Sequence, residues 1–335
     1  MPTPATTSTA AATAATTTQA SNESSNCIRN FRAAVGLRNV YRCAKTDGLA
    51  DRLNADWSVG ERILLLQAGL ILDLRSDAER DEIKSVQWMA QAAGGSFAVY
   101  RDNYSLRPQH EQDKKDNSSS SSTNRQRAVL RLDPLSPTQF MAYLDDHWLT
   151  PAQKLQAAMF KIVSGEQLHS LRIQVLNGKG LSGLNEAILE TGKRDLFAAL
   201  QAMTLHLEKH PGDTVVIHCV QGKDRTGLLV MLCQSLLGVA DEEIVADYHR
   251  SEATLLEGSA AVKTAVSKRQ AGKIDKLIFG GAPKEVMETT LAWIRSKYGT
   301  VSPGYLDAIG FDDSWRNRLL TALQNSPSND RKSRL

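Results

Sequence analysis

The segment Val215–Val230, with the sequence VVIHCVQGKDRTGLLV, constrains the fold of this chain more than any other stretch. A short β-branched run ends at Cys219, a polar loop follows, and a second apolar run with helical spacing begins at Thr226. This pattern predicts a buried strand, a tight loop and a helix in direct succession. In α/β proteins, ligands bind where the strands of a parallel sheet end. Cys219 therefore stands at an expected ligand site.

Apolar runs elsewhere in the chain alternate between strand and helix patterns. Strands are predicted at 39–44, 70–76, 96–104 and 213–219. Helices are predicted at 58–69, 136–149, 151–163, 194–210, 226–237, 241–255, 283–299 and 302–323. Such alternation implies an α/β fold with a mainly parallel central sheet flanked by helices, followed by a helical C-terminal part.

Composition divides the 335-residue chain into one domain and three polar segments. Residues 1–26 are mostly Thr, Ala and Ser and have no targeting pattern, so we expect a disordered tail. Residues 107–127 are polar, serine-rich and aperiodic, which indicates a disordered insertion in a surface loop. The domain is expected at 27–325, and a second disordered tail at 326–335.

The overall composition excludes several classes of protein. With 41% hydrophobic residues and a net charge of only +3, the chain does not favour nucleic-acid binding. No apolar run reaches the roughly 18 residues of a transmembrane segment. Four cysteines without a CxxC pair indicate a reducing compartment, which we take to be the cytoplasm. We expect no metal and no cofactor. The basic stretch 262–276 is typical of a solvated connection and leaves peripheral membrane contact open.

The loop after Cys219 has the properties of an anion-binding site. Its backbone N–H groups can turn inward at the helix N-terminus, where the helix dipole adds positive potential. Gly222 lets the backbone bend closely around an oxyanion. The same field favours a thiolate, because helix N-termini and cations lower a cysteine pKa from about 8.5 to roughly 3.5–7.5. The planar guanidinium of Arg225 can grip two phosphoryl oxygens.

These properties predict a phosphomonoester hydrolase that forms a cysteinyl-phosphate. The thiolate of Cys219 attacks phosphorus, a carboxylic acid protonates the leaving oxygen, and water hydrolyses the intermediate. The hydroxyl of Thr226 is expected to cap the helix and to hydrogen-bond to the sulfur. The phosphate is expected to contact Val220, Gln221, Gly222, Lys223, Asp224, Arg225 and Thr226.

The loop also has other interpretations. A buried cysteine is more often core filler than nucleophile. A nucleotide-binding P-loop is excluded, because Ile217 replaces its first glycine and Asp224 follows the lysine. A rhodanese-like sulfurtransferase would use the cysteine without needing Arg225. A non-catalytic phospho-binding module would keep Arg225 but usually lose the cysteine or the acid.

The string HCVQGKDRTG resembles the phosphate loop of the cysteine-dependent protein tyrosine phosphatase superfamily, and its Lys-Asp pair resembles the bacterial-type, atypical dual-specificity branch. The resemblance covers about 27–325, is weakest over 103–192, and implies phosphotyrosine protein as first substrate and phosphoinositide as second. In this chain Ala33, Ala34 and Val35 replace the usual acidic and glycine residues after Asn-Phe-Arg. Further matching stretches are NFR (30–32), YRCA (41–44), ILDLRSDAER (71–80), ADYHRSE (246–252) and 282–310.

Two aspartates compete for the role of general acid. Asp224 lies inside the loop, and the resemblance makes its carboxyl a plausible proton donor, with a loop-stiffening hydrogen bond as the alternative. Asp73 lies at the C-terminal end of the strand at 70–76, with an ion pair to Arg75 as its alternative. Asp224 is slightly favoured.

Four further residues are assigned supporting roles. His218 is expected to orient the loop through backbone hydrogen bonds. By resemblance, Arg42 and Arg75 brace the phosphate loop, with surface ion pairs as the alternative. Lys223 either adds charge for a second phosphate or is a solvated loop lysine. Cys43, where the family often has Ser, could form a disulfide with the catalytic cysteine on oxidation.

Overall fold

A computed structural model of the chain describes residues 28–51, 61, 63, 67–82, 84, 97–101, 127–257 and 273–325. The predicted tails at 1–26 and 326–335 lie outside these residues. So do the insertion up to residue 126 and most of the basic stretch 262–276.

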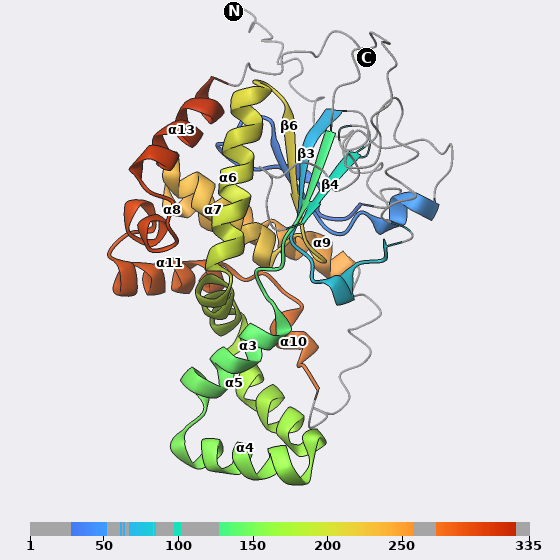
Figure 1. The fold of residues 1–335 in the computed structure, drawn as a ribbon, viewed down its shortest axis with the longest axis vertical. Helices are drawn as coiled ribbons and strands as arrows, with labels where there is room; N and C mark the ends of the chain where they lie inside the picture. The colour runs from blue at the N-terminus through green and yellow to red at the C-terminus, as the bar shows by residue number, and fades with distance from the viewer. Residues whose placement is uncertain are drawn as a thin grey trace, which may run out of the picture.

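A mostly parallel sheet forms the centre of the molecule (Figure 1). In the described part of the chain it has six strands in the order β1-β2-β6-β3-β5-β4. β1 runs antiparallel to β2, and every other neighbouring pair is parallel. The predicted parallel α/β architecture is therefore confirmed. The strands are β1 (Arg32–Ala33), β2 (Val40–Cys43), β3 (Ala68–Asp73), β4 (Phe97–Arg101), β5 (Arg127–Arg131) and β6 (Thr214–His218).

The strand that leads to the cysteine lies inside the sheet, between β2 and β3. All five residues of β6 are buried. Side chains along a strand point alternately to the two faces of the sheet, and both faces are covered at β6. Val215 and Ile217 belong to the large core, whereas Val216 joins a smaller cluster on the opposite face with Ile28 and Leu49.

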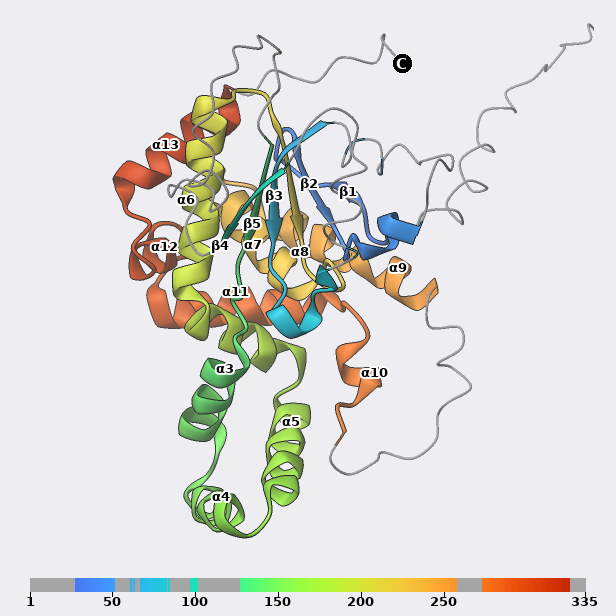
Figure 2. The same ribbon diagram turned by 45° about the vertical axis from the view of Figure 1, so that its right-hand side comes forward.

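Helices cover the face of the sheet that carries the large core (Figures 1 and 2). α6 packs on β3 and α7 packs on β6, while α13 lies against α6. The helices are α3 (Pro137–Tyr143), α4 (Pro151–Val163), α5 (Gly165–Thr191), α6 (Lys193–Lys209), α7 (Asp224–Leu236), α8 (Asp241–His249), α9 (Ser251–Glu257), α10 (Lys276–Phe279), α11 (Lys284–Tyr298), α12 (Leu306–Ala308) and α13 (Asp313–Gln324). Short helical turns are η2 (Asp47–Asp51), η4 (Asp77–Glu79), η5 (Leu144–Trp148) and η6 (Val301–Tyr305). The helical C-terminal part is confirmed.

An arm projects from one end of this body (Figures 1 and 2). It consists of α3, η5, α4 and the first part of α5, and α4 lies at its far end. α5 changes direction at Gly180, whose backbone is non-helical. The arm has its own apolar cluster, which includes Phe140, Trp148 and Leu168.

The secondary-structure predictions missed the short elements β1 and α10 and were wrong at three longer elements. The helix predicted at 58–69 ends too late, because Ala68 and Gly69 already belong to β3. β5 was not predicted, and the predicted insertion overlaps its first residue, Arg127. The long helix α5 was also missed.

Candidate active site

Cys219 follows directly on β6 and is 2% exposed. α7 begins at Asp224, two residues earlier than predicted, so the connecting loop is short and Arg225 lies in the first helical turn. The cysteine and the arginine therefore stand at the two ends of one loop, next to the positive end of the α7 dipole. The thiol of Cys219 is free.

The loop is pressed against the end of β2. Gly222 has a φ of 66°, and a Cβ atom there would lie 2.2 Å from the carbonyl oxygen of Cys43. Only glycine allows this close approach. The carbonyl of Val220 also accepts a hydrogen bond of 3.0 Å from the backbone N–H of Lys45. The strand β2 thus supports the underside of the loop.

Arg225 is 8% exposed, and its guanidinium is held at fixed points. Nη1 donates to the carbonyl of Leu74 at 3.1 Å. Nη1 and Nη2 grip the two carboxylate oxygens of Glu79 at 2.5 and 2.8 Å. Burial alone would lower the pKa of Arg225, but the hydrogen bonds that it donates to Glu79 and the charge of Cys219 raise it above its usual value. Arg225 therefore stays charged.

Sequence reasoning missed Glu79. Its carboxylate accepts hydrogen bonds from the backbone and hydroxyl of Ser76, at 2.9 and 3.1 Å. Burial would raise the pKa of Glu79, but its hydrogen bond to Arg225 outweighs burial and lowers the pKa. The sequence did contain a local indication of where this carboxylate lies, because Ser-x-x-Glu at 76–79 is the capping-box pattern. That pattern places the carboxylate but does not reveal its arginine partner.

Arg42 lies beneath the loop and is 1% exposed, so the surface ion pair considered for it is wrong. Its Nη2 donates to the carbonyl of Gly222 at 3.0 Å, and its Nη1 donates to Asp247 at 3.0 Å. Asn30 donates from Nδ2 to the carbonyls of Gln221 and Gly222, at 3.1 and 3.0 Å. These two buried side chains therefore hold the carbonyls of Gln221 and Gly222 from beneath the loop. Asn30 and Asp247 were not predicted as individual site residues.

Asp73 is 3% exposed and is bound by Arg75, whose Nε and Nη2 both donate at 2.9 Å. Burial would raise the pKa of Asp73, but His218 and the hydrogen bonds from Arg75 outweigh it and hold the pKa well below its usual range. Arg75 also binds Asp47 at 2.7 Å and is 1% exposed. The ion pair between Asp73 and Arg75 is thus present, but it is buried rather than on the surface.

His218 is 1% exposed at the end of β6. Its backbone carbonyl accepts a hydrogen bond of 2.9 Å from the N–H of Leu74, which ties β6 to β3 just before the cysteine. Burial lowers the pKa of its imidazole to about 4. The ring is therefore neutral at neutral pH.

The Lys223 side chain is completely buried, so the solvated-lysine interpretation is wrong. Its Nζ donates to the carbonyls of Phe279 and Gly281, at 2.9 and 2.7 Å. It also lies 3.5 Å from the carboxylate of Asp224. Lys223 therefore ties the loop to the segment after α10.

Asp224 and Thr226 lie in the first turn of α7. The hydroxyl of Tyr248 donates to the Asp224 carboxylate at 3.4 Å. The expected roles of Thr226 are absent, because α7 starts before it and its hydroxyl is buried without a hydrogen-bond partner among the described residues. Neither the cap nor the bond to sulfur is formed.

A third carboxyl group, Asp133, lies just beyond the end of β5, at the edge of the sheet where Cys219 lies. Its Oδ1 is buried and has no partner in the described part of the chain. Burial raises the pKa of Asp133, and the charge of Glu79 acts in the same direction. A hydrogen bond from Leu135 and the charge of Arg225 oppose this but are outweighed. Sequence reasoning missed Asp133 because β5 itself was missed.

Cys43 lies at the end of β2, in register with His218, and is fully buried. Burial and the neighbouring Cys219 raise the pKa of its thiol. Both thiols are free in this structure. The proposed disulfide between them stays a prediction.

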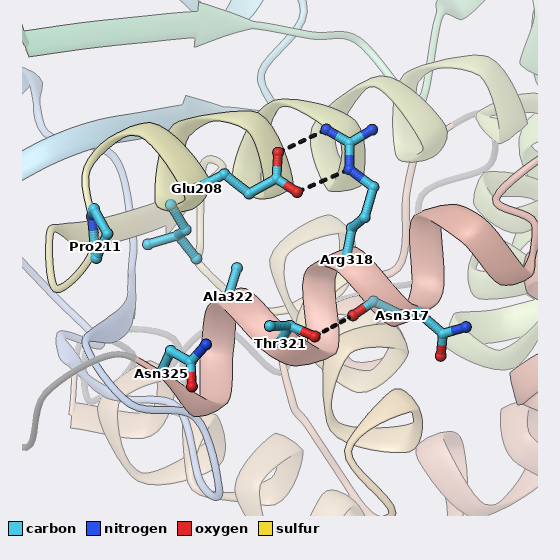
Figure 3. Close-up of a pocket in the computed structure, with 8 residues that line it drawn as sticks. Glu208, Pro211, Asn317, Arg318, Thr321, Ala322 and Asn325 are labelled. Carbon is cyan, nitrogen blue, oxygen red and sulfur yellow. Dashed lines mark hydrogen bonds and ion pairs between the residues drawn. The ribbon is translucent and has the colours of Figure 1, made fainter.

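One surface pocket in the described part of the chain is remote from this loop (Figure 3). It lies between the end of α6 and α13, where Glu208 and Arg318 form an ion pair at 2.6 Å. α6 ends just before β6 begins, whereas Cys219 lies at the other end of that strand. A second pocket, between α8 and α11, contains Asp241 and Arg295. Neither pocket is lined by a residue of the loop.

Fold and loop together define a class of α/β protein that presents a cysteine and a buried arginine at the two ends of one short loop between the central strand and a helix. Residues 29–325 match the sequence profile of the tyrosine phosphatase family, so the chain belongs to that family. No helix in the described part of the chain is long and apolar enough to span a membrane.

Two relatives carry related names. A protein of Cupriavidus necator named as a candidate tyrosine-protein phosphatase is 34% identical over 97 residues, which are 29% of this chain and 31% of that protein. The triple specificity protein phosphatase PtpB of Mycobacterium tuberculosis is 29% identical over 125 residues, which are 33% of this chain and 44% of that protein. The chain thus spans less than half the length of each of these curated relatives.

Proposed function

We propose that this protein hydrolyses phosphate monoesters through a phosphorylated Cys219, with phosphotyrosine protein as its first substrate. The observation that carries this proposal is the short loop with Cys219 at one end and the buried, immobilised guanidinium of Arg225 at the other. A sulfurtransferase would not need this arginine. A phospho-binding module would not need a free cysteine at the end of the central strand.

The chemistry follows from the placement of the loop. The sulfur of Cys219 attacks phosphorus, an S–P bond forms and the P–O bond to the leaving group breaks. The amides from Val220 to Thr226, the helix dipole and Arg225 offset the negative charge on the phosphoryl oxygens. Water then attacks phosphorus, the S–P bond breaks, and inorganic phosphate leaves. We expect no metal or cofactor in either step.

Asp133 is our choice for the general acid. A proton donor must hold its proton near neutral pH and must reach the leaving oxygen. Asp73 fails the first requirement, because its ion pair with Arg75 keeps it ionised. Asp224 has its carboxylate next to Lys223 and Tyr248. Asp133 has an unpartnered oxygen and a raised pKa, which supports the role.

Phosphoinositides are the second substrate class that we propose. One relative is named for triple specificity, which is in keeping with a broad range of phosphate esters. A buried Lys223 leaves no free ammonium there for a second phosphate, so lipid activity would need other cations. Phosphotyrosine therefore remains the first choice.

The test compares wild-type protein with Cys219→Ser on a phosphotyrosine peptide, with released phosphate as the readout. We expect the variant to lose activity by about a thousandfold or more, because a neutral hydroxyl replaces the nucleophilic sulfur. Cys233→Ser is the matched control, since Cys233 is a buried core cysteine. Equal phosphate release by wild type and Cys219→Ser would end the proposal.

A further inference from the structure

The helix at the far end of the arm has an apolar outer face that no part of the described chain covers. Leu155, Met159, Ile162 and Val163 of α4 are 69, 59, 88 and 75% exposed. Their spacing places all four on one side of the helix. Large apolar groups clustered on a surface usually mark a binding site.

The arm itself does not need this face for folding. The opposite side of α4 carries Ala157, which is 4% exposed, and Phe160, which is partly buried. These two pack into the cluster that contains Phe140 and Leu168. Since the inner side already closes the core of the arm, the four outer side chains have no structural role within it.

The charges of α4 indicate what covers the apolar face. The helix contains two lysines, Lys154 and Lys161, and no acidic residue, and both lysines are exposed. Lys154 donates to the backbone carbonyl of Asp146 at 2.8 Å, which leaves its charge uncompensated by that contact. An apolar face with lysines at its border is typical of a helix that lies in a membrane interface.

The acidic groups around the helix do not cancel this pattern. Asp145 lies 3.8 Å from Lys161, but its carboxylate already binds Arg172 at 2.5 and 2.9 Å. Asp146 and Glu166 lie beyond the two ends of α4. Pairing with the same face of a second copy would bring lysines together, whereas anionic headgroups supply the opposite charge.

The arm also leaves the body on the side of the reactive loop. α3 follows β5 after five residues, and β5 runs parallel to β3 and β6, so its end lies at the same edge of the sheet as Cys219. In both ribbon views the arm extends away from this edge, with α4 farthest out (Figures 1 and 2). A surface bound by α4 would therefore lie on the side of the loop.

We infer that α4 is an interfacial helix that docks the protein on anionic phospholipid surfaces through Leu155, Met159, Ile162 and Val163. The apolar side chains enter the headgroup region and the two lysines contact the anionic lipids. This docking goes beyond the proposed hydrolysis and does not depend on it, because it requires neither Cys219 nor Arg225.

The experiment measures co-sedimentation of the full chain with vesicles of equal parts phosphatidylcholine and phosphatidylserine. The double variant Leu155→Gln, Ile162→Gln should bind at least about tenfold more weakly than wild type. Leu277→Gln on α10 is the matched control, because Leu277 is also exposed, at 74%, but lies outside α4; its binding should be unchanged. Hydrolysis of soluble para-nitrophenyl phosphate should be equal in all three proteins.

Several outcomes would overturn the inference. Wild-type protein that stays in solution with the vesicles refutes it, as does a double variant that binds like wild type. Concentration-dependent dimers that the double variant abolishes would assign the face to a second copy. A rise in the soluble activity of the double variant would assign it to closure over the loop. Loss of phosphatase activity in Cys219→Ser with unchanged vesicle binding separates the two proposals.

Discussion

At the residue scale, three carboxyl groups near the loop differ in what surrounds them. Asp73 is locked in an ion pair, Asp224 faces Tyr248, and Asp133 keeps an unpartnered buried oxygen. We predict that Asp133→Asn lowers turnover of a phosphotyrosine peptide by about 100-fold or more, the usual contribution of a general acid. It should lower turnover of an ester with a good leaving group much less, because such a group departs without a proton. Steady-state rates on both substrates check this.

Asp224→Asn is the matched variant for this comparison, because it makes the same side-chain change at the other aspartate considered as proton donor, whose carboxylate lies next to Lys223 and Tyr248. If the dependence on the leaving group is seen in Asp224→Asn and is absent in Asp133→Asn, the proton donor is Asp224. The interpretation given to the buried Asp133 would then be wrong.

From the sequence, Cys219 and Arg225 could be proposed as the reactive pair, but the groups that hold them could not be predicted. Cys219 and Arg225 are six residues apart in one contiguous motif, and such local spacing can be read directly from the sequence. Glu79 and Asp247 are 146 and 205 residues from their partners, Arg225 and Arg42. Such contacts depend on which strands become neighbours, and this is set by the packing of the whole sheet.

At the element scale, the strand β2 and the loop between Cys219 and Arg225 must approach within contact distance. We predict that Gly222→Ala abolishes most phosphatase activity and lowers the free energy of unfolding by on the order of 1–3 kcal/mol or more. The cause is a Cβ atom 2.2 Å from the carbonyl oxygen of Cys43, added to a positive φ that disfavours alanine. Urea unfolding and phosphate release measure the two effects.

Gly238→Ala separates backbone strain from this steric conflict. Gly238 also has a positive φ, of 73°, but a Cβ atom there would meet nothing within 4 Å. This control should cost on the order of 1 kcal/mol of stability and keep its activity. Equal losses in both variants would show that contact with β2 is unimportant for the loop.

Elements with a regular apolar period were predicted, and the missed ones have a physical reason. β5 has arginines at both ends, yet it is fully buried because Arg131 pairs with Glu82 and Arg127 stacks on Phe97. α5 carries glycines at 178, 180 and 183, which indicate a helix stop; the backbone is indeed non-helical at Gly180, but helical segments continue on both sides of this kink.

At the scale of the whole molecule, stability should depend on pH through the buried, neutral imidazole of His218 at the end of the central strand β6. Burial lowers the pKa of His218 from 6.5 to about 4, so the unfolded chain binds a proton in this range and the folded chain does not. The contribution of His218 to the free energy of unfolding is therefore fully present above about pH 6.5. It is lost as the pH falls towards 4, by on the order of 3 kcal/mol in total. Asp73 adds its own loss only at lower pH, because its pKa is also depressed.

Urea unfolding between about pH 7 and pH 4.5 measures this dependence. His218→Asn should be less stable at neutral pH, but the slope of its unfolding free energy against pH should be smaller than that of wild type. His169→Asn is the matched control, because His169 is exposed on the arm and should leave the slope unchanged. The slope of the unfolding free energy against pH tests the prediction, whereas the absolute stability does not, since removal of any buried ring costs packing energy. If His218→Asn keeps the wild-type slope, the proton that destabilises the fold binds elsewhere, and the imidazole next to Cys219 is not the group that limits stability in acid.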